Sequence, residues 1–241
     1  MKKLLGLIII LAILGGLGYI FYSNNYAMTL IFKADNDKAI TIINNAIENN
    51  SNWDYYNFIT TTKMINTTTE DSATTEASLK IVKLEDDSYE FTGNVKKIEG
   101  TTTEEYTVYY KEGKLYTLSE TSKTWQTMTI EEAMTSIFDT FSSSVFPATY
   151  SEIESSDFED LKTTFAFDLS PFYVGQKFTI TTSSLVPTIV LDVDFLGNLR
   201  NKTFSATYGA LEMSISSTYL TVNKPLTLVF PTDLADYIET V

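Results

Sequence analysis

One acidic segment has the residue types of a cation site. The segment 192–198, DVDFLGN, partly matches a calcium-binding loop, but it lacks a third ligand position and the closing glutamate. Apolar residues at 189, 191, 193 and 195 alternate with residues of the other face, which is typical of a half-buried strand entering a turn. We therefore interpret the two aspartates as structural and predict no metal site.

Other polar clusters also fall short of a catalytic arrangement. Glu131 and Glu132 occupy the first turn of a predicted helix, where carboxylates offset the helix dipole. The serines at 142–144 lack the flanking glycines of a nucleophile elbow. The chain has no histidine and no cysteine, so it lacks the commonest general base, the thiolate nucleophile and any disulfide. The sequence predicts a protein that is not an enzyme and has no catalytic residue and no cofactor. A carboxylate hydrolase remains an alternative, and it requires two acidic residues that converge with raised pKa values.

The charge of the chain excludes one class of partner. The formal net charge is −14 over 241 residues, with Arg200 as the only arginine. Such a surface repels phosphate backbones, so we predict no nucleic-acid partner. A protein partner is not identifiable from the sequence.

An apolar run near the N-terminus determines the predicted location. Lys2 and Lys3 precede 19 uncharged, mainly apolar residues from Leu4 to Tyr22, enough to span a hydrocarbon core of roughly 30 Å. We predict one transmembrane helix within residues 1–22, with a cytoplasmic N-terminus and the rest of the chain outside the plasma membrane. A signal peptide, cleaved to release a secreted protein, is the alternative. Residues 23–37 form the predicted linker, and residues 38–241 the extracytoplasmic domain.

The stretch from Tyr106 to Phe141 organises the predicted domain. Two strands rich in β-branched and aromatic residues flank a short loop containing Gly113, a pattern typical of a hairpin. Thr129 and Glu132 then form a capping box before apolar residues at helical spacing. The apolar face of this predicted helix needs a partner surface, and the sheet supplies one.

The rest of the domain predicts one helix followed by further strands around the same core. The helix covers Ala39–Asn49, capped by Asp35 or Asp37, with residues 42, 43, 46 and 47 facing inward. Polar turns are expected at 65–75 and 96–105, and a second short helix at 150–161. The predicted strands are 53–64, 77–84, 88–95, 163–169, 176–182, 188–195, 200–208, 211–218 and 226–230.

Large apolar side chains on these elements are the candidate ligand-binding residues. They form the packed face of a curved sheet, or part of that face lines a cavity for an apolar ligand, since pockets are mostly apolar. The sequence does not separate the two. The candidates are Tyr89, Phe91, Tyr106, Tyr110, Tyr116, Trp125, Met134, Phe138, Phe165, Phe167, Phe178 and Phe204.

The order of elements resembles the LolA-like superfamily of lipoprotein carriers and glycolipid-binding lipoproteins. The matching features are the 109–116 hairpin YYKEGKLY with Trp125 and its following helix, the 192–200 strand–turn–strand, and the ending 219–231, YLTVNKPLTLVFP. The resemblance covers roughly Lys38 to Pro231. It implies an α+β, mainly antiparallel fold, a strongly curved half-barrel sheet with helices covering the concave face and a hydrophobic cavity between them. Here the transmembrane helix would replace the lipid-anchoring cysteine of many such proteins.

This resemblance implies a membrane-anchored extracytoplasmic domain that binds a lipid, a lipoprotein acyl chain or another apolar ligand. An uncleaved anchor argues against a diffusing shuttle and favours a tethered binding or sensing domain. The alternative is a non-enzymatic surface interaction or structural module with a solid core and no ligand.

Overall fold

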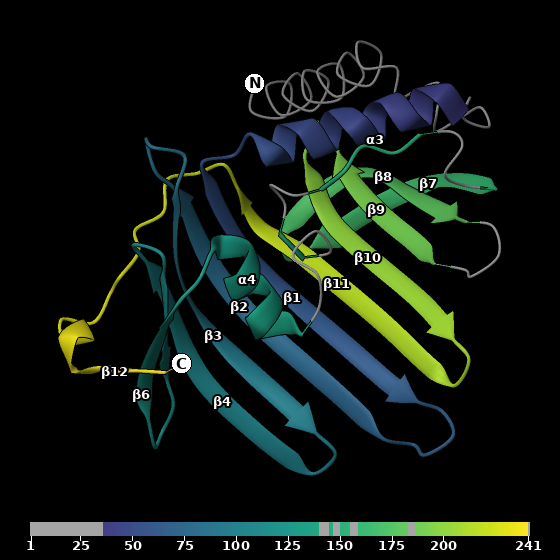
Figure 1. The fold of residues 1–241 in the computed structure, drawn as a ribbon. Helices are drawn as coiled ribbons and strands as arrows, with labels where there is room; N and C mark the ends of the chain where they lie inside the picture. Colours follow the sequence, from purple (N-terminus) through teal and green to yellow (C-terminus); the bar gives the residue numbers. More distant parts are fainter. Residues whose placement is uncertain (1–35, 140–144, 147–149, 155–158, 183–186, 241) are drawn as a thin grey trace, which may run out of the picture.

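A computed structural model of the chain describes residues 36–139, 145–146, 150–154, 159–182 and 187–240. Within these ranges, twelve strands form one open, curved sheet in the order β12-β6-β5-β4-β3-β2-β1-β11-β10-β9-β8-β7 (Figure 1). Every neighbouring pair is antiparallel except β12 with β6. The prediction of a mainly antiparallel sheet with helices is confirmed.

The elements are α3 (Asn36–Ser51), β1 (Tyr55–Asn66), β2 (Ser72–Lys83), β3 (Tyr89–Glu99), β4 (Thr102–Lys111), β5 (Lys114–Leu118), β6 (Lys123–Thr127), α4 (Ile130–Phe138), β7 (Asp160–Leu169), β8 (Phe172–Thr181), β9 (Thr188–Asp194), β10 (Leu199–Tyr208), β11 (Leu211–Val222), η3 (Leu234–Asp236) and β12 (Ile238–Glu239).

The predicted membrane span, Leu4–Tyr22, lies outside the described residues. Among the residues that the structure describes, no helix has the length and apolar character needed to cross a bilayer.

Alternation along the strands gives the sheet one buried face, called here the inner face. On β1, Tyr56 and Phe58 are fully buried, and they pair with Ile81 and Leu79 of β2. Phe58 also pairs with Tyr219 across the β1–β11 junction, which joins strands far apart in the sequence. Because side chains point to opposite faces with a period of two, these pairs place all five side chains on one face. The hydrophobic core lies on this face.

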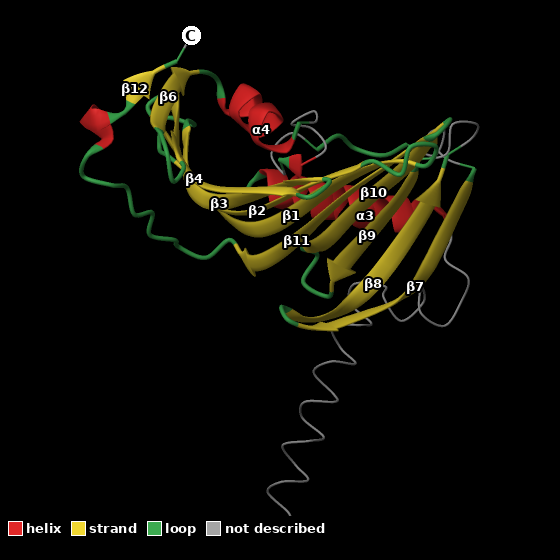
Figure 2. Ribbon diagram, turned by 90° about the horizontal axis from the view of Figure 1, so that it is seen from below, coloured by secondary structure: helices red, strands yellow, loops and turns green. Residues whose placement is uncertain are grey.

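Both helices pack on the inner face. Helix α4 contacts β2, and α3 contacts β9 and β10. Figure 2 shows the two helices on the same side of the sheet, with β6 at the curled edge near α4. The two helices therefore cover different parts of one continuous surface.

Helix α4 begins and ends as its sequence predicts. The Thr129 hydroxyl accepts a hydrogen bond from the Glu132 amide at 3.2 Å, and the Glu132 carboxylate accepts one from the Thr129 amide at 2.7 Å. This reciprocal pair is the predicted capping box. The helix ends at Asp139, which adopts φ 52° in the left-handed region. Its apolar side chains, including Met134 and Phe138, are fully buried.

The hairpin between β4 and β5 is also confirmed. Gly113 has φ 72° and Glu112 has φ 52°, so both central residues adopt positive φ. The sequence marks Gly113 for this role because glycine has no Cβ penalty there.

Four expectations about the elements are wrong. The Thr-rich ranges 65–75 and 96–105 are mostly strand, with only tight turns between them, because threonine favours the pleated conformation. Residues 226–230 form no strand; Phe230 instead packs against Tyr109 of β4, with ring centroids 6.4 Å apart. The described part of the predicted helix at 150–161 is irregular chain followed by the start of β7.

Candidate ligand-binding site

An apolar cavity of about 270 Å³ lies beneath α3, between this helix, the inner face of β8–β10 and the segment 150–153. Its apolar lining comes from isoleucine and leucine side chains of all three parts. The lining residues are Ile47, Tyr150, Ser151, Glu152, Ile153, Ile180, Thr182, Ile189, Leu191, Leu199 and Lys202. Its volume is near the lower end of ligand pockets, roughly 300–1,000 Å³.

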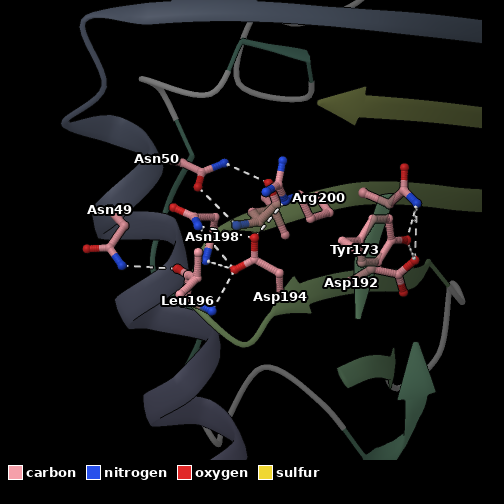
Figure 3. Close-up of polar contacts among 11 residues, drawn as sticks. Asn49, Asn50, Tyr173, Asp192, Asp194, Leu196, Asn198 and Arg200 are labelled. Atoms are coloured by element: carbon pink, nitrogen blue, oxygen red, sulfur yellow. Dashed lines mark hydrogen bonds and ion pairs between the residues drawn. The ribbon is translucent and has the colours of Figure 1, made fainter. Parts of the chain in front are cut away.

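Amide side chains of α3 hold the roof of this cavity in place. The Asn44 side chain donates to the Ile153 carbonyl and accepts from the Ile153 amide, both at 2.9 Å. At the end of the helix, the Asn50 side chain accepts from the Leu199 amide at 3.1 Å, and Asn49 donates to the Gly197 carbonyl at 3.0 Å (Figure 3). The helix is thereby fixed to the loop on one side of the cavity and to the β9–β10 turn on the other.

The β9–β10 turn is itself built around the carboxylate of Asp194. This carboxylate accepts hydrogen bonds from the Leu196 and Asn198 amides, each at 2.9 Å, and pairs with Arg200 Nε at 2.7 Å (Figure 3). These hydrogen bonds give Asp194 a role in holding the turn. Among the described residues, no cluster of acidic side chains could hold a metal ion.

Asp192 belongs to a second polar group on the opposite face of the sheet. The Tyr173 hydroxyl donates to Asp192 Oδ2 at 2.7 Å, and the Asn201 side chain donates to the same oxygen at 3.1 Å (Figure 3). Burial and the adjacent carboxylate raise the pKa of Tyr173. This group joins β8, β9 and β10 from behind, so it supports the cavity floor and does not line it.

Lys202 is the cationic residue of the cavity lining. It lies on β10 with its side chain on the inner face, opposite Leu191 of β9 and Ser217 of β11. Its Nζ is 3.4 Å from the centroid of the Tyr150 ring. Burial lowers the pKa of Lys202 to about 7. An amine with this pKa changes charge near neutral pH.

The aromatic ring beneath this ammonium is held rigidly. The Tyr150 and Tyr219 hydroxyls are 2.6 Å apart, and the Tyr150 hydroxyl also donates to the Val145 carbonyl at 3.3 Å. Burial raises the pKa of both tyrosines, so both stay neutral at physiological pH. The Tyr150 ring offers Lys202 a cation–π contact.

The twelve side chains predicted from the sequence are spread over the sheet and α4, and none lines this cavity. Phe91, Met134, Phe138, Phe178 and Tyr110 are buried in the core. Partly buried against that core are Tyr89, Tyr106 and Phe204. Tyr116 and Trp125 pair across β5 and β6, and Phe165 and Phe167 of β7 are each 54% exposed. Whether any of them contacts a ligand stays a prediction.

Two larger hollows include some of these residues but differ in character. Tyr89 and Tyr110 border a hollow of about 840 Å³ at the start of α4, and Tyr106 borders one of about 680 Å³. Both are more open than the cavity beneath α3, and acidic side chains are prominent in their linings. Neither offers an apolar ligand the same enclosure.

Lys202 was not among the candidates predicted from the sequence, although its position carries one signal. Lys202 has the same parity along β10 as Phe204 and Ala206, which belong to the inner face. A lysine at such a position is unusual, because a charge is costly to bury. The cavity itself has no comparable signal.

Comparison with known proteins shows the fold. No known protein family matches the sequence, and neither does any curated protein. Among solved structures, LprF from Mycobacterium bovis matches with a TM-score of 0.55 and 11% identity, over 81% of this chain and 97% of that one. The LolA-like resemblance is confirmed at the level of the fold. At this identity the similarity describes the fold alone.

Proposed function

We propose that the chain is a membrane-anchored extracytoplasmic domain that binds a lipid, an acyl chain or another apolar ligand beneath α3. In this proposal Leu4–Tyr22 spans the plasma membrane, and the curved sheet acts as a half barrel whose concave face is covered by the helices. The shared fold with LprF supports this architecture.

One observation carries the proposal, namely the apolar cavity of about 270 Å³. Six isoleucine and leucine side chains contribute to its wall, including Ile47, Ile153 and Ile189. An alkyl chain entering it would gain about 0.8 kcal/mol for each CH₂ removed from water. This gain needs no chemical step on the ligand, so we propose binding without catalysis.

The carboxyl groups support the same choice over a hydrolase. Among the described residues, Asp86 and Asp233 are the carboxyl groups with a resolved shift, and both pKa values are lowered, that of Asp86 through hydrogen bonds from Ser88 and that of Asp233 through its contact with Lys123. A carboxylate hydrolase needs the opposite shift on its general acid.

The test is photolabelling of the full chain, solubilised in amphipol, with an alkyne-tagged hexadecanol that carries a diazirine. We expect adducts on residues that line the cavity, located by peptide mass spectrometry. Ile189→Trp should remove them by filling the cavity. The matched control, Ile59→Trp, adds the same ring at an exposed position of β1 and should leave them unchanged. Labelling that ignores Ile189→Trp, or that is absent from the lining, would contradict the proposal.

An exposed apolar strip favours a second candidate function, a surface interaction module without a ligand. The strip consists of Phe165, Phe167, Leu169 and Phe172 at the β7–β8 hairpin, with exposures of 54%, 54%, 72% and 67%. Contiguous exposed apolar residues commonly mark contact sites. Under this alternative the alcohol leaves the cavity unlabelled, and a benzophenone amino acid at position 169 crosslinks to a partner that Phe167→Ser loses.

A further inference from the structure

Strand β7 is an edge of the sheet, and one side of its backbone has no strand partner among the described residues. It pairs with β8 over its whole length, Asp160–Leu169, and no other strand that the structure describes pairs with it. Figure 2 shows β7 at one end of the curved sheet and β6 near the other, where β12 lies beside β6. The unpaired N–H and C=O groups of an edge strand can pair with a strand of another chain. Within the described ranges, the chain covers the β6 edge with its own C-terminal segment and gives β7 no such cover.

The side chains of this edge continue the apolar inner face. Thr163 pairs with the core residue Phe178, so the odd-numbered residues of β7 belong to that face. Three of them are large, apolar and exposed, namely Phe165, Phe167 and Leu169. Contiguous exposed apolar side chains of this kind commonly mark a contact site. The backbone and the side chains of β7 therefore both favour a partner that supplies a strand.

The sequence of β7 is close to self-complementary when two copies run antiparallel. A two-fold axis perpendicular to the sheet keeps both inner faces on one side, so odd-numbered residues lie opposite odd-numbered residues. With the axis at Phe165, the two copies of this ring lie opposite each other. Thr163 then lies opposite Phe167 of the second copy, and Leu161 lies opposite its Leu169. The inner face of the junction would be apolar apart from the threonines.

The charged residues of β7 favour this register over its neighbours. Lys162 lies opposite Asp168 of the second copy, and the two-fold axis forms this pair twice. An axis at Thr164 would instead place Asp160 opposite Asp168 of the second copy, a pair of like charges. An axis at Ala166 places no carboxylate opposite Lys162. Opposite charges across a strand pair stabilise it and like charges destabilise it, so the register centred on residue 165 is preferred.

The contacts that these charged side chains already make are compatible with the pairing. Lys162 Nζ lies 3.1 Å from Asp160 Oδ2, but the two side chains are 73% and 53% exposed, so this ion pair contributes little. Asp168 Oδ1 accepts a hydrogen bond from the Ser170 amide at 3.0 Å. Because a carboxylate has about four acceptor sites, this turn contact leaves Asp168 able to accept from a lysine as well.

We propose that β7 pairs antiparallel with β7 of a second copy of this chain, centred on Phe165, so that the two sheets join at this edge. The pairing satisfies backbone groups on the outer side of β7 and covers its exposed phenylalanines in one step. The inference goes beyond the proposed function and does not depend on the cavity beneath α3.

The experiment is disulfide crosslinking of the full chain in amphipol, and the absence of native cysteine makes it specific for the introduced position. Opposite residues of an antiparallel pair have Cα atoms roughly 4.5–5.5 Å apart, within reach of a disulfide, whereas diagonal neighbours at roughly 7–8 Å are beyond it. Phe165→Cys should therefore give a covalent dimer on a denaturing gel after mild oxidation. Thr164→Cys, the matched control at the adjacent exposed residue, should give little.

A second pair of variants keeps every phenylalanine in place. In the proposed register, position 164 of one copy lies opposite position 166 of the other. Thr164→Cys and Ala166→Cys, carried on chains with different tags, should therefore crosslink when mixed, although neither variant does so alone.

Exchanging the charges tests the register independently. Lys162→Glu, combined with Phe165→Cys, turns both opposite-charge pairs into like-charge pairs and should slow crosslinking by roughly ten-fold. Adding Asp168→Lys should restore the rate. Lys80→Glu makes the same charge change at an exposed position of β2 and should leave the rate unchanged.

Three outcomes would overturn the inference. They are a dimer formed by Thr164→Cys alone, the absence of a dimer from both Phe165→Cys and the mixed pair, and a Lys162→Glu variant that crosslinks as fast as its parent. Labelling of the cavity by the photoreactive hexadecanol should be the same in all of these variants, so the lipid-binding proposal and the dimer stand or fall separately.

Discussion

Helix α4 covers β2 on one part of the inner face, and α3 covers β9 and β10 on another, but the two meet different side chains. On the neighbouring strands β3 and β4 the contacts are large and aromatic; Phe91 and Tyr110, for example, stack with centroids 5.3 Å apart and planes 9° apart. Beneath α3 the wall is branched aliphatic, with Lys202 among the isoleucines. The core formed by α4, β3 and β4 is called the packed region below, and the cavity beneath α3 is called the receptive region. One sheet holds both.

The largest expected effect is truncation in the packed region. Phe91→Ala removes a fully buried ring and its stacking on Tyr110, and it should lower the free energy of unfolding by about 3–5 kcal/mol. Ile189→Ala, at the cavity wall, should cost only roughly 1–2 kcal/mol because Ile189 is half-buried. Urea unfolding of the full chain in mild detergent, followed by tryptophan fluorescence, measures both. Equal losses would remove the distinction between the regions.

Adding a large side chain should also destabilise the packed region more than the receptive region. Ala133 of α4 is fully buried, so Ala133→Phe has no space and should destabilise the fold by about 1–3 kcal/mol. Ile189→Trp adds a ring where the cavity offers room, and it should cost less while abolishing labelling by the photoreactive alcohol. The same unfolding assay ranks the two variants. A larger loss at position 189 would mean that the cavity wall cannot accommodate a side chain.

The protonated amine of Lys202 should lower the free energy of unfolding of the domain. Its pKa is about 7 in the folded chain against 10.5 in the unfolded reference, so the unfolded chain binds more protons between these pH values. Stability contributed by this site therefore rises with pH from about 7 to 10.5, and the full penalty applies below pH 7. Lys202→Met should be more stable than wild type at pH 7, by up to roughly 4 kcal/mol.

The difference between Lys202→Met and wild type should then shrink toward pH 10.5, whereas it should stay constant below pH 7. Comparing each variant with wild type at the same pH cancels the other titrating groups. Thermal unfolding at pH 6, 7, 8, 9 and 10 provides the measurement. A difference that does not depend on pH would show that the amine is well solvated.

The sequence predicts the packed region better than the receptive one, and local rules explain why. The capping box at Thr129 and the positive φ at Gly113 depend on a few adjacent residues, so both are predictable. The pairing of β1 with β11 joins strands about 150 residues apart, and no local rule gives it. The cavity depends on how α3 packs over β9 and β10, which long-range strand pairing brings together. Its existence and volume therefore cannot be predicted from the sequence. Lys202 was still recognisable from its parity with Phe204.

The smallest expected effects concern the hydrogen bonds that hold α4 and α3 over the inner face. Thr129→Ala removes the capping hydroxyl of α4 and should cost about 1 kcal/mol of stability without changing ligand binding. Asn44→Ala removes the two hydrogen bonds between α3 and Ile153, at a similar cost, since each contributes about 1 kcal/mol or less. Only the second variant loosens the contact between α3 and the segment 150–153, so only it should also weaken labelling of the cavity by the photoreactive hexadecanol. Matched losses of stability with unequal losses of binding would tie the receptive region to α3. Equal losses of binding would instead mean that the whole inner face responds as one body.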